Sequence, residues 1–185
     1  MLGRMRRRYT REYYLTLVEA LREARPDIAL STDIIVGFPG ETEAEHQSTL
    51  SLLEEVRYDF IYSFNYSPRP HTPASRDLPD DVPLEVKKRR LHEVQGLQAE
   101  ITHECMQVWE GKVLPVLVEG PSKRDPTWRS GRISQNWIVN FEADDGLQAR
   151  VVNVRIDRAL SNCLLGTRVP PGGADRHGAA LRVLN

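Results

Sequence analysis

Charged side chains in the first part of the chain are the first candidates for ligand chemistry. Five arginines lie close together, namely Arg4, Arg6, Arg7, Arg8 and Arg11. A guanidinium group is a planar fork that suits a carboxylate or a phosphate, so the cluster is a candidate anion site, with a solvated basic surface as the alternative. Asp33 interrupts an apolar run at residues 28–36, where an unpaired carboxylate is costly. We therefore expect Asp33 to meet either a structural partner or a ligand.

A tight turn follows that apolar run. Residues 37–40 read GFPG, and glycine allows the backbone to approach a ligand closely. A lone G-x-x-G is a weak motif, which gains weight because Asp33 precedes it in the same unit. Residues 66–70, YSPRP, end the next apolar run, either at the same ligand site or as a rigid proline turn with a surface arginine. The carboxyl ends of parallel strands line ligand sites in α/β proteins, which favours ligand contact.

Metal and thiol chemistry are not expected. The five histidines, His46, His71, His92, His103 and His177, include no pair spaced four residues apart on a helix. Cys105 lies two residues from His103, so the two side chains face different ways on a helix. Cys105 and Cys163 are the only cysteines, too few for a cysteine-only metal site, an iron–sulfur cluster or a disulfide framework.

Basic and amide side chains near aromatic residues mark a second candidate site, for RNA. Its members are Lys123, Arg124, Arg129, Arg132, Asn136 and Asn140. Trp128, Trp137 and Phe141 lie among them, and cations beside aromatic rings suit phosphate contact combined with base stacking. The alternative is that Trp137 and Phe141 belong to the core and that the cations are solvated. RNA binding by this part alone should be weak and sensitive to salt.

The elements that position the first site alternate between helix and strand. Helices are predicted from Thr10 to Arg25, from a capping box at Thr42, and from about residue 83 to 109; strands are predicted at 28–36 and 59–67. This order predicts an α/β fold of parallel βα units, with strand 28–36 buried on both faces. Two strands cannot complete such a sheet, so partner strands are missing or come from another subunit. Residues 67–83 read as a proline-rich loop.

The hydrophobic period changes from 3.6 to 2 after Gly111. Strands are predicted at 112–119, 130–141 and 147–156, with a short one at 163–168. Several short strands in so few residues predict a small antiparallel barrel of the oligonucleotide-binding kind. The predicted organisation is therefore a partial parallel βα region at 1–111, a barrel at 112–168 and a disordered tail at 169–185.

Composition excludes several classes of protein. The 185 residues carry a net charge of −1, and no apolar run approaches the roughly 20 residues of a membrane span. The basic start lacks the apolar stretch of a secretory signal, so a cytoplasmic location is expected. Charge is segregated, with a local charge of +4 in residues 1–25, −9 in 26–111 and +3 in 112–168. Basic ends can face a polyanion, although solvated surface charge is the commoner explanation.

Several of these runs together resemble one enzyme family. MRRRYT at 5–10, STDIIVGFPGET at 31–42 and YSPRP at 66–70 resemble the later half of the radical S-adenosylmethionine barrel of tRNA methylthiotransferases. VEGPSKR at 118–124, SGR at 130–132 and VNF at 139–141 resemble that family's C-terminal TRAM barrel, and the MiaB type is the most similar branch.

The resemblance implies a function, cofactors and residue roles. The family adds a methylthio group to C2 of N6-isopentenyladenosine beside the tRNA anticodon, using S-adenosylmethionine and two [4Fe-4S] clusters. It implies that Arg7 meets the methionine carboxylate of S-adenosylmethionine, that Asp33 approaches the ribose hydroxyls or the amino group, and that Gly37 and Phe38 lie near the adenine. The basic residues of the TRAM barrel would hold the anticodon stem-loop.

The sequence also departs from the family pattern. The cluster-binding C-x-x-x-C-x-x-C run is absent, neither Cys105 nor Cys163 matches a ligand position, and His71 stands where the family usually has glycine. This chain alone is therefore expected to be inactive and to need the missing N-terminal half or a sulfur donor as a partner. The alternatives are a non-catalytic tRNA-binding fragment and a truncated gene product.

Overall fold

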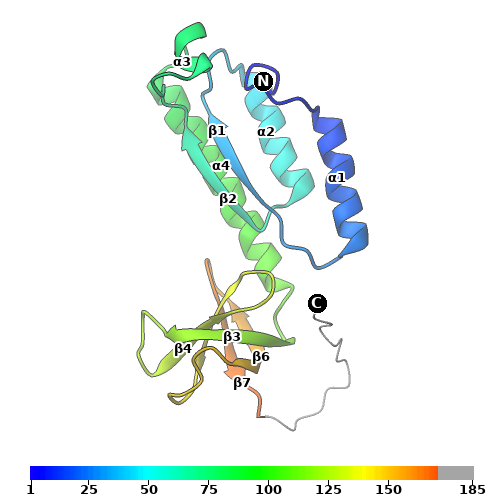
Figure 1. Ribbon diagram of the computed structural model, residues 1–185, viewed down its shortest axis with the longest axis vertical. Coiled ribbons are helices and arrows are strands. Elements are labelled where there is room, and N and C mark those ends of the chain that lie inside the picture. The colour runs from blue at the N-terminus through cyan, green and yellow to red at the C-terminus, as the bar shows by residue number, and fades with distance from the viewer. Residues whose placement is uncertain (171–185) are drawn as a thin grey trace. The chain divides into compact units, whose positions relative to one another are not determined.

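The computed structural model describes residues 1–170 and divides the chain into two compact units (Figure 1). The first unit is Met1–Val108 with Leu160–Asn162, and the second is Trp109–Ala159 together with the described residues from Cys163 onward. Apart from Val169 and Pro170, the predicted tail lies outside the described residues, as does His177.

The first unit contains four helices and a two-stranded parallel sheet. In chain order its elements are α1 (Arg11–Ala24), β1 (Ser31–Val36), α2 (Glu43–Val56), β2 (Phe60–Asn65), α3 (Pro73–Asp77) and α4 (Leu84–Gln107). The register of the sheet runs from Ser31 opposite Phe60 to Val36 opposite Asn65. The predicted alternation of helix and strand is thus confirmed for the described residues.

Side-chain caps explain where the first helices begin. The Thr10 hydroxyl accepts a hydrogen bond from the Tyr13 N–H, and Thr42 forms the predicted capping box with Glu45. The loop at 67–83 is not entirely irregular, because it contains the short helix α3. Thr72 caps α3, and Pro73 occupies its first turn, where a missing N–H costs nothing.

Helices α1, α2 and α4 share one core with one face of the sheet. Leu53 and Val94 are fully buried in the same cluster as Val36 of β1. Burial along β1 alternates, so Asp33 and Ile35 are exposed on the other face. The prediction of a strand buried on both faces is therefore wrong for this structure, because the helical core covers one face of the two strands. It follows that Asp33 is solvated and needs no partner.

The second unit is a closed barrel of five strands. These are β3 (Val113–Pro121), β4 (Trp128–Arg132), β5 (Ile138–Glu142), β6 (Val151–Ala159) and β7 (Leu164–Arg168). Their order around the barrel is β3-β4-β5-β7-β6, with β6 also paired to β3 and with β5 and β7 parallel. Strands β6-β3-β4-β5 form a Greek key, as in oligonucleotide-binding barrels.

The strand limits correct two predictions. The single strand expected at 130–141 is two strands, joined by a turn in which Asn136 has a φ of 68°. The strand expected from residue 147 begins only at Val151. Turn residues inside an apolar alternation hid the first break, because a positive φ is available to asparagine without a glycine signal.

Candidate functional site

The carboxyl ends of β1 and β2 build a rim in the first unit. The Tyr66 N–H donates to the Val36 carbonyl at 2.8 Å, which extends the parallel pairing by one residue. Just beyond the strands, the rings of Phe38 and Tyr66 meet edge to face with centroids 5.1 Å apart. The GFPG and YSPRP segments therefore lie side by side, as the two parallel strands require.

The GFPG turn is held by buried charge. Its two glycines, Gly37 and Gly40, have φ values of 69° and 71°. The Gly37 N–H donates to a Glu41 carboxylate oxygen at 2.6 Å, and Arg90 of α4 donates to the same oxygen at 2.8 Å. Both side chains of that ion pair are at most 5% exposed. An unpaired charge at this depth would be costly, so the pair fixes the turn on α4.

Lys87 occupies the space that a side chain at Gly37 would need. A Cβ built on Gly37 would collide with the Lys87 stem. The ammonium group of Lys87 donates to Asp80 at 2.5 Å and to the Tyr66 carbonyl at 3.3 Å, and it lies 5.3 Å from the centre of the Tyr66 ring. The Gly37 N–H is thus bonded to Glu41, and the Lys87 stem fills the space where a side chain at this position would lie.

Sequence reasoning missed Lys87, Arg90 and Glu41. The available signal was the spacing of Lys87 and Arg90, three residues apart on one predicted helix and therefore on one face. The acidic partner cannot be read from spacing, because Glu41 lies 49 residues from Arg90.

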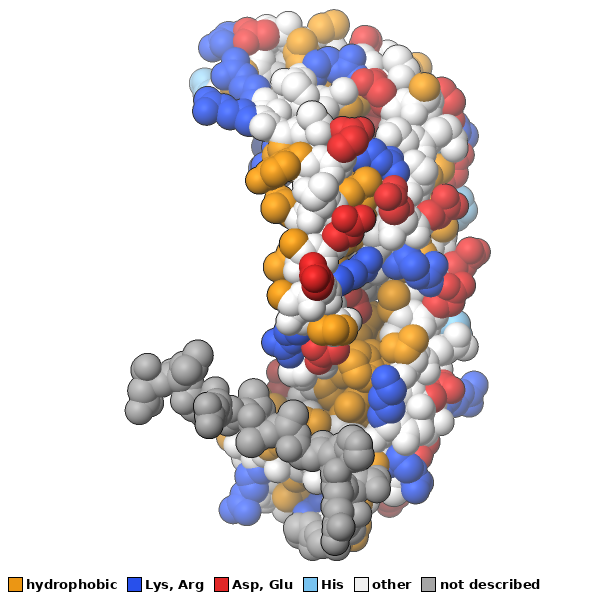
Figure 2. Space-filling model, turned by 90° about the vertical axis from the view of Figure 1, so that its right-hand side faces the viewer, with side chains coloured by type: hydrophobic (Ala, Val, Ile, Leu, Met, Phe, Trp, Pro, Cys, Tyr) orange, Lys and Arg blue, Asp and Glu red, His pale blue; other side chains and the backbone are white. Residues whose placement is uncertain are grey.

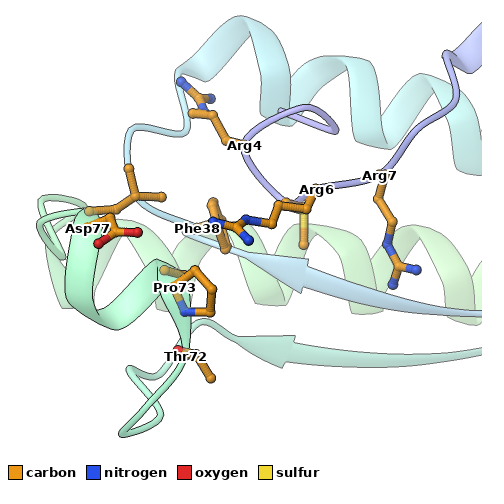
Figure 3. A pocket seen from close by; sticks show the side chains of 10 residues that line it. Arg4, Arg6, Arg7, Phe38, Thr72, Pro73 and Asp77 are labelled. Carbon is orange, nitrogen blue, oxygen red and sulfur yellow. The ribbon is translucent and has the colours of Figure 1, made fainter.

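A cleft of about 280 Å³ opens between this rim and the segment that precedes α1 (Figure 3). Its lining includes Arg6, Arg7 and Phe38, together with Thr72 and Asp77 at α3. Figure 3 shows Arg6 reaching toward Phe38. The structure therefore brings Arg7 and Phe38 to one cleft.

The predicted arginine cluster divides in two. Arg4 donates to Glu45 at 2.6 Å, and Arg11 donates to Glu55 at 2.8 Å and to the Ser48 carbonyl at 2.5 Å. These two guanidinium groups hold the segment against α2. Arg6, Arg7 and Arg8 make no side-chain hydrogen bond or ion pair within residues 1–170, so their donors face solvent or the cleft.

Asp33 lies on the exposed face of β1, opposite Tyr62 of β2. Its carboxylate makes no hydrogen bond or ion pair with another described residue, and it is not part of the cleft lining. The same face carries Ile35, Tyr62 and Phe64, which are 39%, 65% and 54% exposed. An acid among exposed apolar side chains is available to a ligand or to a further layer of protein.

Three groups at the α2–α4 contact have the spacing of metal ligands. Ligand atoms of Glu43, His46 and Glu93 lie within 4.8 Å of one another. Arg89, however, donates at 2.7 Å to both Glu43 and Glu93, and His46 lies 2.6 Å from Glu93. The Arg89 guanidinium, helped by Gln47 and Arg90, lowers the pKa of Glu43 to about 2. Because the Arg89 guanidinium already supplies the positive charge, we interpret the group as an ion-pair network.

The two cysteines are separate and neither resembles a cluster ligand. The Cys105 thiol of α4 is half-buried beside the Arg57 carbonyl, and burial raises its pKa. Cys163 is buried in the barrel unit. A raised pKa disfavours the thiolate that metals bind.

Four of the six predicted RNA-binding residues lie on or beside the strand pair β4–β5. Outward positions alternate, and they include Trp128, Arg132 and Asn140, whereas Arg129 and Phe141 share the opposite, buried side. Asn136 lies in the turn between the two strands. This strand pair and the loop before it are the usual nucleic-acid face of such barrels. Lys123 and Arg124 lie in that loop and are exposed.

Two of the predicted RNA-binding residues, Arg129 and Arg132, make contacts within the barrel itself. Arg129 is only 7% exposed and donates to the carbonyls of Pro126 and Asp144 and to the Asp145 carboxylate. Arg132 donates to the Asn136 carbonyl at 2.8 Å and to Glu119 at 3.2 Å. Arg129 therefore ties two loops together, and Arg132 shapes the Asn136 turn while staying partly exposed.

The predicted stacking aromatics are mostly core. Trp137 is 1% exposed and Phe141 is fully buried, so neither ring can stack on a base. The stacking role is therefore wrong for these two residues and stays open for the half-buried Trp128. Alternation along a strand does not tell which face is inside when both faces carry large side chains.

Comparison with known proteins gives a match for the barrel region and for most of the chain. Residues 107–169 match the family model of the TRAM domain. The chain is 48% identical over 169 residues to the tRNA-2-methylthio-N(6)-dimethylallyladenosine synthase of Syntrophotalea carbinolica, in an alignment that covers 91% of this chain and 38% of the relative. Residues 107–169 thus resemble a TRAM domain, and the chain is similar to these synthases almost throughout its length.

Two further relatives carry the same name. The protein of Geobacter metallireducens is 51% identical over 166 residues, covering 90% of this chain and 37% of the relative. That of Geobacillus thermodenitrificans is 48% identical over 166 residues, covering 90% and 32%. The chain therefore spans about a third of the length of the curated relatives it matches. The resemblance to MiaB-type methylthiotransferases is confirmed.

Within residues 1–170, no helix is both long and apolar enough to cross a membrane.

Proposed function

We propose that this chain is the part of a tRNA methylthiotransferase that supplies the last βα units of a radical S-adenosylmethionine barrel and the TRAM domain. The observation that supports this proposal most strongly is the 46–51% identity to such proteins over at least nine-tenths of the chain. The reaction would be methylthiolation at C2 of N6-isopentenyladenosine next to the anticodon, in the cytoplasm. Residues 1–111 would form the partial barrel with its linking helix, and 112–168 the RNA-binding barrel.

The rim residues suit S-adenosylmethionine in different degrees. Arg7 offers a fork without a protein partner to the methionine carboxylate, and Phe38 lines the same cleft. Asp33 offers an unpaired acceptor to hydroxyl or amino groups on the exposed strand face. Gly37, enclosed by Lys87 and Glu41, would act by shaping the turn near the adenine. When bound, this cofactor supplies the methyl group and the radical.

The [4Fe-4S] clusters that the family uses do not fit the residues of this chain. Cys105 is half-buried with a raised pKa, and Cys163 lies in the other unit. Cluster ligands would have to come from elsewhere in the whole protein, as would the sulfur donor. The steps left to this chain are therefore binding of S-adenosylmethionine and of RNA.

The barrel would hold the anticodon stem-loop of the tRNA. Lys123 and Arg124 are exposed and make no side-chain bond within residues 1–170, so they suit phosphates. Asn140 and Arg132 share the outer face of β4–β5, where an amide and a guanidinium can meet base edges. Arg129 and Asn136 would support these contacts by fixing the adjoining loops.

A chimera tests the proposed function. This chain replaces the matching 37% of the Geobacter metallireducens relative, and the fusion is expressed in a host that lacks its own methylthiotransferase. We expect 2-methylthio-N6-isopentenyladenosine in the tRNA, detected by mass spectrometry of nucleosides. A matched fusion without the cluster cysteines should yield none. A folded fusion that holds its clusters but gives no product would rule the proposal out.

A non-catalytic tRNA-binding module is the second candidate. It is favoured by the barrel, which is closed, whereas the β1–β2 sheet has only two strands. In that case the isolated chain would bind a tRNA stem-loop while the chimera stays inactive. A binding assay on the isolated chain, together with the product assay on the chimera, therefore separates the two candidates.

A further inference from the structure

Most cations of the first unit bond to protein groups, and the exceptions are informative. Between residues 1 and 108, ten lysine and arginine side chains make hydrogen bonds or ion pairs with protein groups, as Arg25 does with Asp27, Arg57 with Glu104 and Arg76 with Asp77. Four make none: Arg6, Arg7, Arg8 and Arg69. This pattern is not that of a surface with scattered solvated charge, because opposite charges are matched almost everywhere else.

The four unpaired arginines, which we call the rim arginines, belong to one end of the unit. Arg6 and Arg7 line the cleft together with Thr72, and the Thr72 hydroxyl donates to the Arg69 carbonyl at 2.8 Å. Arg8 follows Arg7 directly. The Arg76 guanidinium, with a smaller contribution from Arg6, lowers the pKa of Asp77 and so agrees with Arg6 lying beside α3. Figure 2 shows several Lys and Arg side chains along the upper left edge of the first unit, with Asp and Glu side chains also present at that end.

We propose that Arg6, Arg8 and Arg69 bind phosphate groups of the RNA substrate, so that the first unit has an RNA-binding surface separate from the barrel. The inference rests on the proposed function, which supplies an RNA and assigns Arg7 to a carboxylate. Arg8 and Arg69 are exposed and do not line the cleft, so one small anion in the cleft cannot reach all three. A polynucleotide offers a row of phosphates, and each contact releases condensed counterions.

A salt titration with matched variants tests the surface. Binding of the full chain to a fluorescent RNA stem-loop is measured by anisotropy between about 50 and 200 mM salt. The test variant combines Arg6→Gln, Arg8→Gln and Arg69→Gln. The control combines Arg25→Gln, Arg57→Gln and Arg76→Gln, which removes the same charge from exposed, ion-paired positions.

The rim variant should lose three phosphate contacts. We expect the slope of log affinity against log salt to fall by about 2, and affinity at the lowest salt to fall at least about tenfold. The control should change affinity less than about twofold, since its arginines already face carboxylates. Equal losses in the two variants would mean a general charge effect and would overturn the proposal.

A barrel variant separates this inference from the proposed function. If Lys123→Gln with Arg124→Gln abolishes binding and the rim variant does not weaken it, the barrel alone binds RNA and the inference is overturned, while the proposed function stands. If the unaltered chain shows no salt-sensitive RNA binding, both fail.

Chemical protection gives a readout that needs no variant. Phenylglyoxal modification of the native chain is followed by mass spectrometry. RNA should protect Arg6, Arg8 and Arg69 several-fold more than Arg76. If inorganic phosphate at matched ionic strength protects all three as well as RNA does, the site is one for small anions and the proposal is wrong.

Discussion

Neighbouring arginines in one short segment have different environments. Arg4 is held by Glu45, whereas Arg7 keeps its donors free at the cleft. A side chain whose donors make no hydrogen bond to the protein can donate them to a ligand. Hydrogen bonds to a charged group contribute about 1.5–3 kcal/mol. This contrast, rather than the presence of arginine, supports the role proposed for Arg7.

Arg7→Gln in the chimera should therefore raise the KM for S-adenosylmethionine by about 10- to 100-fold. The kcat should change much less, because the lost contact is made in the ground state as well as in the transition state. Initial rates at varied cofactor concentration measure both. Arg25→Gln, an exposed arginine paired with Asp27 outside the cleft, is the matched control. An unchanged KM would remove Arg7 from the site.

At the scale of elements, helices α2 and α4 are joined by ion pairs whose carboxylates have lowered pKa values. Arg89 and Gln47 hold the pKa of Glu43 near 2, far below its ordinary value of 4.5. Burial tends to raise the pKa of Glu93, but hydrogen bonds from His46 and Arg89 outweigh it and lower the value. These carboxylates are ionised in the folded state at pH values where the unfolded chain has begun to bind protons.

The first unit should consequently lose stability in acid. A depressed folded-state pKa contributes stability that is complete above about pH 4.5 and is lost as pH falls toward 2. Urea unfolding followed by helical circular dichroism at pH 7, 4.5 and 3 measures the loss. Glu43→Gln should flatten this dependence, and an equally steep loss in that variant would contradict the assignment.

The barrel depends on glycines where strands cross closely. A Cβ on Gly131 of β4 would collide with the Leu117 carbonyl and lie 2.7 Å from a Val116 methyl group. The pairing of β3 with β4 shifts register between Val118 and Gly120, next to this contact. Bulges of this kind bend a strand around a small barrel, and the bend leaves no room for a side chain.

Gly131→Ala should destabilise the barrel by about 1–3 kcal/mol. The matched change Gly96→Ala, in the exposed middle of α4 with open space around it, should stabilise by about 0.5–1 kcal/mol. Denaturant titrations that follow the barrel and the helices separately measure the two effects. Opposite signs are the expected result, and a stabilising Gly131→Ala would show that the strands can separate.

At the scale of the whole molecule, the chain has two separate hydrophobic cores. Leu53 is fully buried in the helical unit, and Phe141 is fully buried in the barrel. Core truncation removes packing and leaves a cavity, at a cost of about 2–5 kcal/mol for a leucine or a phenylalanine.

Leu53→Ala should accordingly speed amide hydrogen exchange in α2, α4 and the two parallel strands, and leave β3 to β7 nearly unchanged. Phe141→Ala should give the reverse. Exchange followed peptide by peptide with mass spectrometry distinguishes these patterns. Uniform acceleration across residues 1–170 in both variants would show one cooperative unit instead.

The sequence predicted much of the fold because several signals are local. The Thr42–Glu45 capping box, the alternation of helix and strand, and the change of period after Gly111 each depend on residues a few positions apart, so spacing reports them. Helix α3, the turn at Asn136 and the solvated Asp33 escaped, because a short proline-capped helix, a positive φ outside glycine and the covering of one sheet face have no periodic signature.

The sequence by itself determined the order of the elements, the barrel class, the family resemblance and the residues that carry charge. Only the tertiary structure decided which charges are free. Arg90 proved to be the buried partner of Glu41, 49 residues away, and Lys87 the buried partner of the nearby Asp80. Arg129 ties two loops together, and the rim arginines are unpaired. The physical reason is that an ion pair depends on distance in space, and the fold brings together groups, such as Glu41 and Arg90, whose separation along the chain leaves no local pattern.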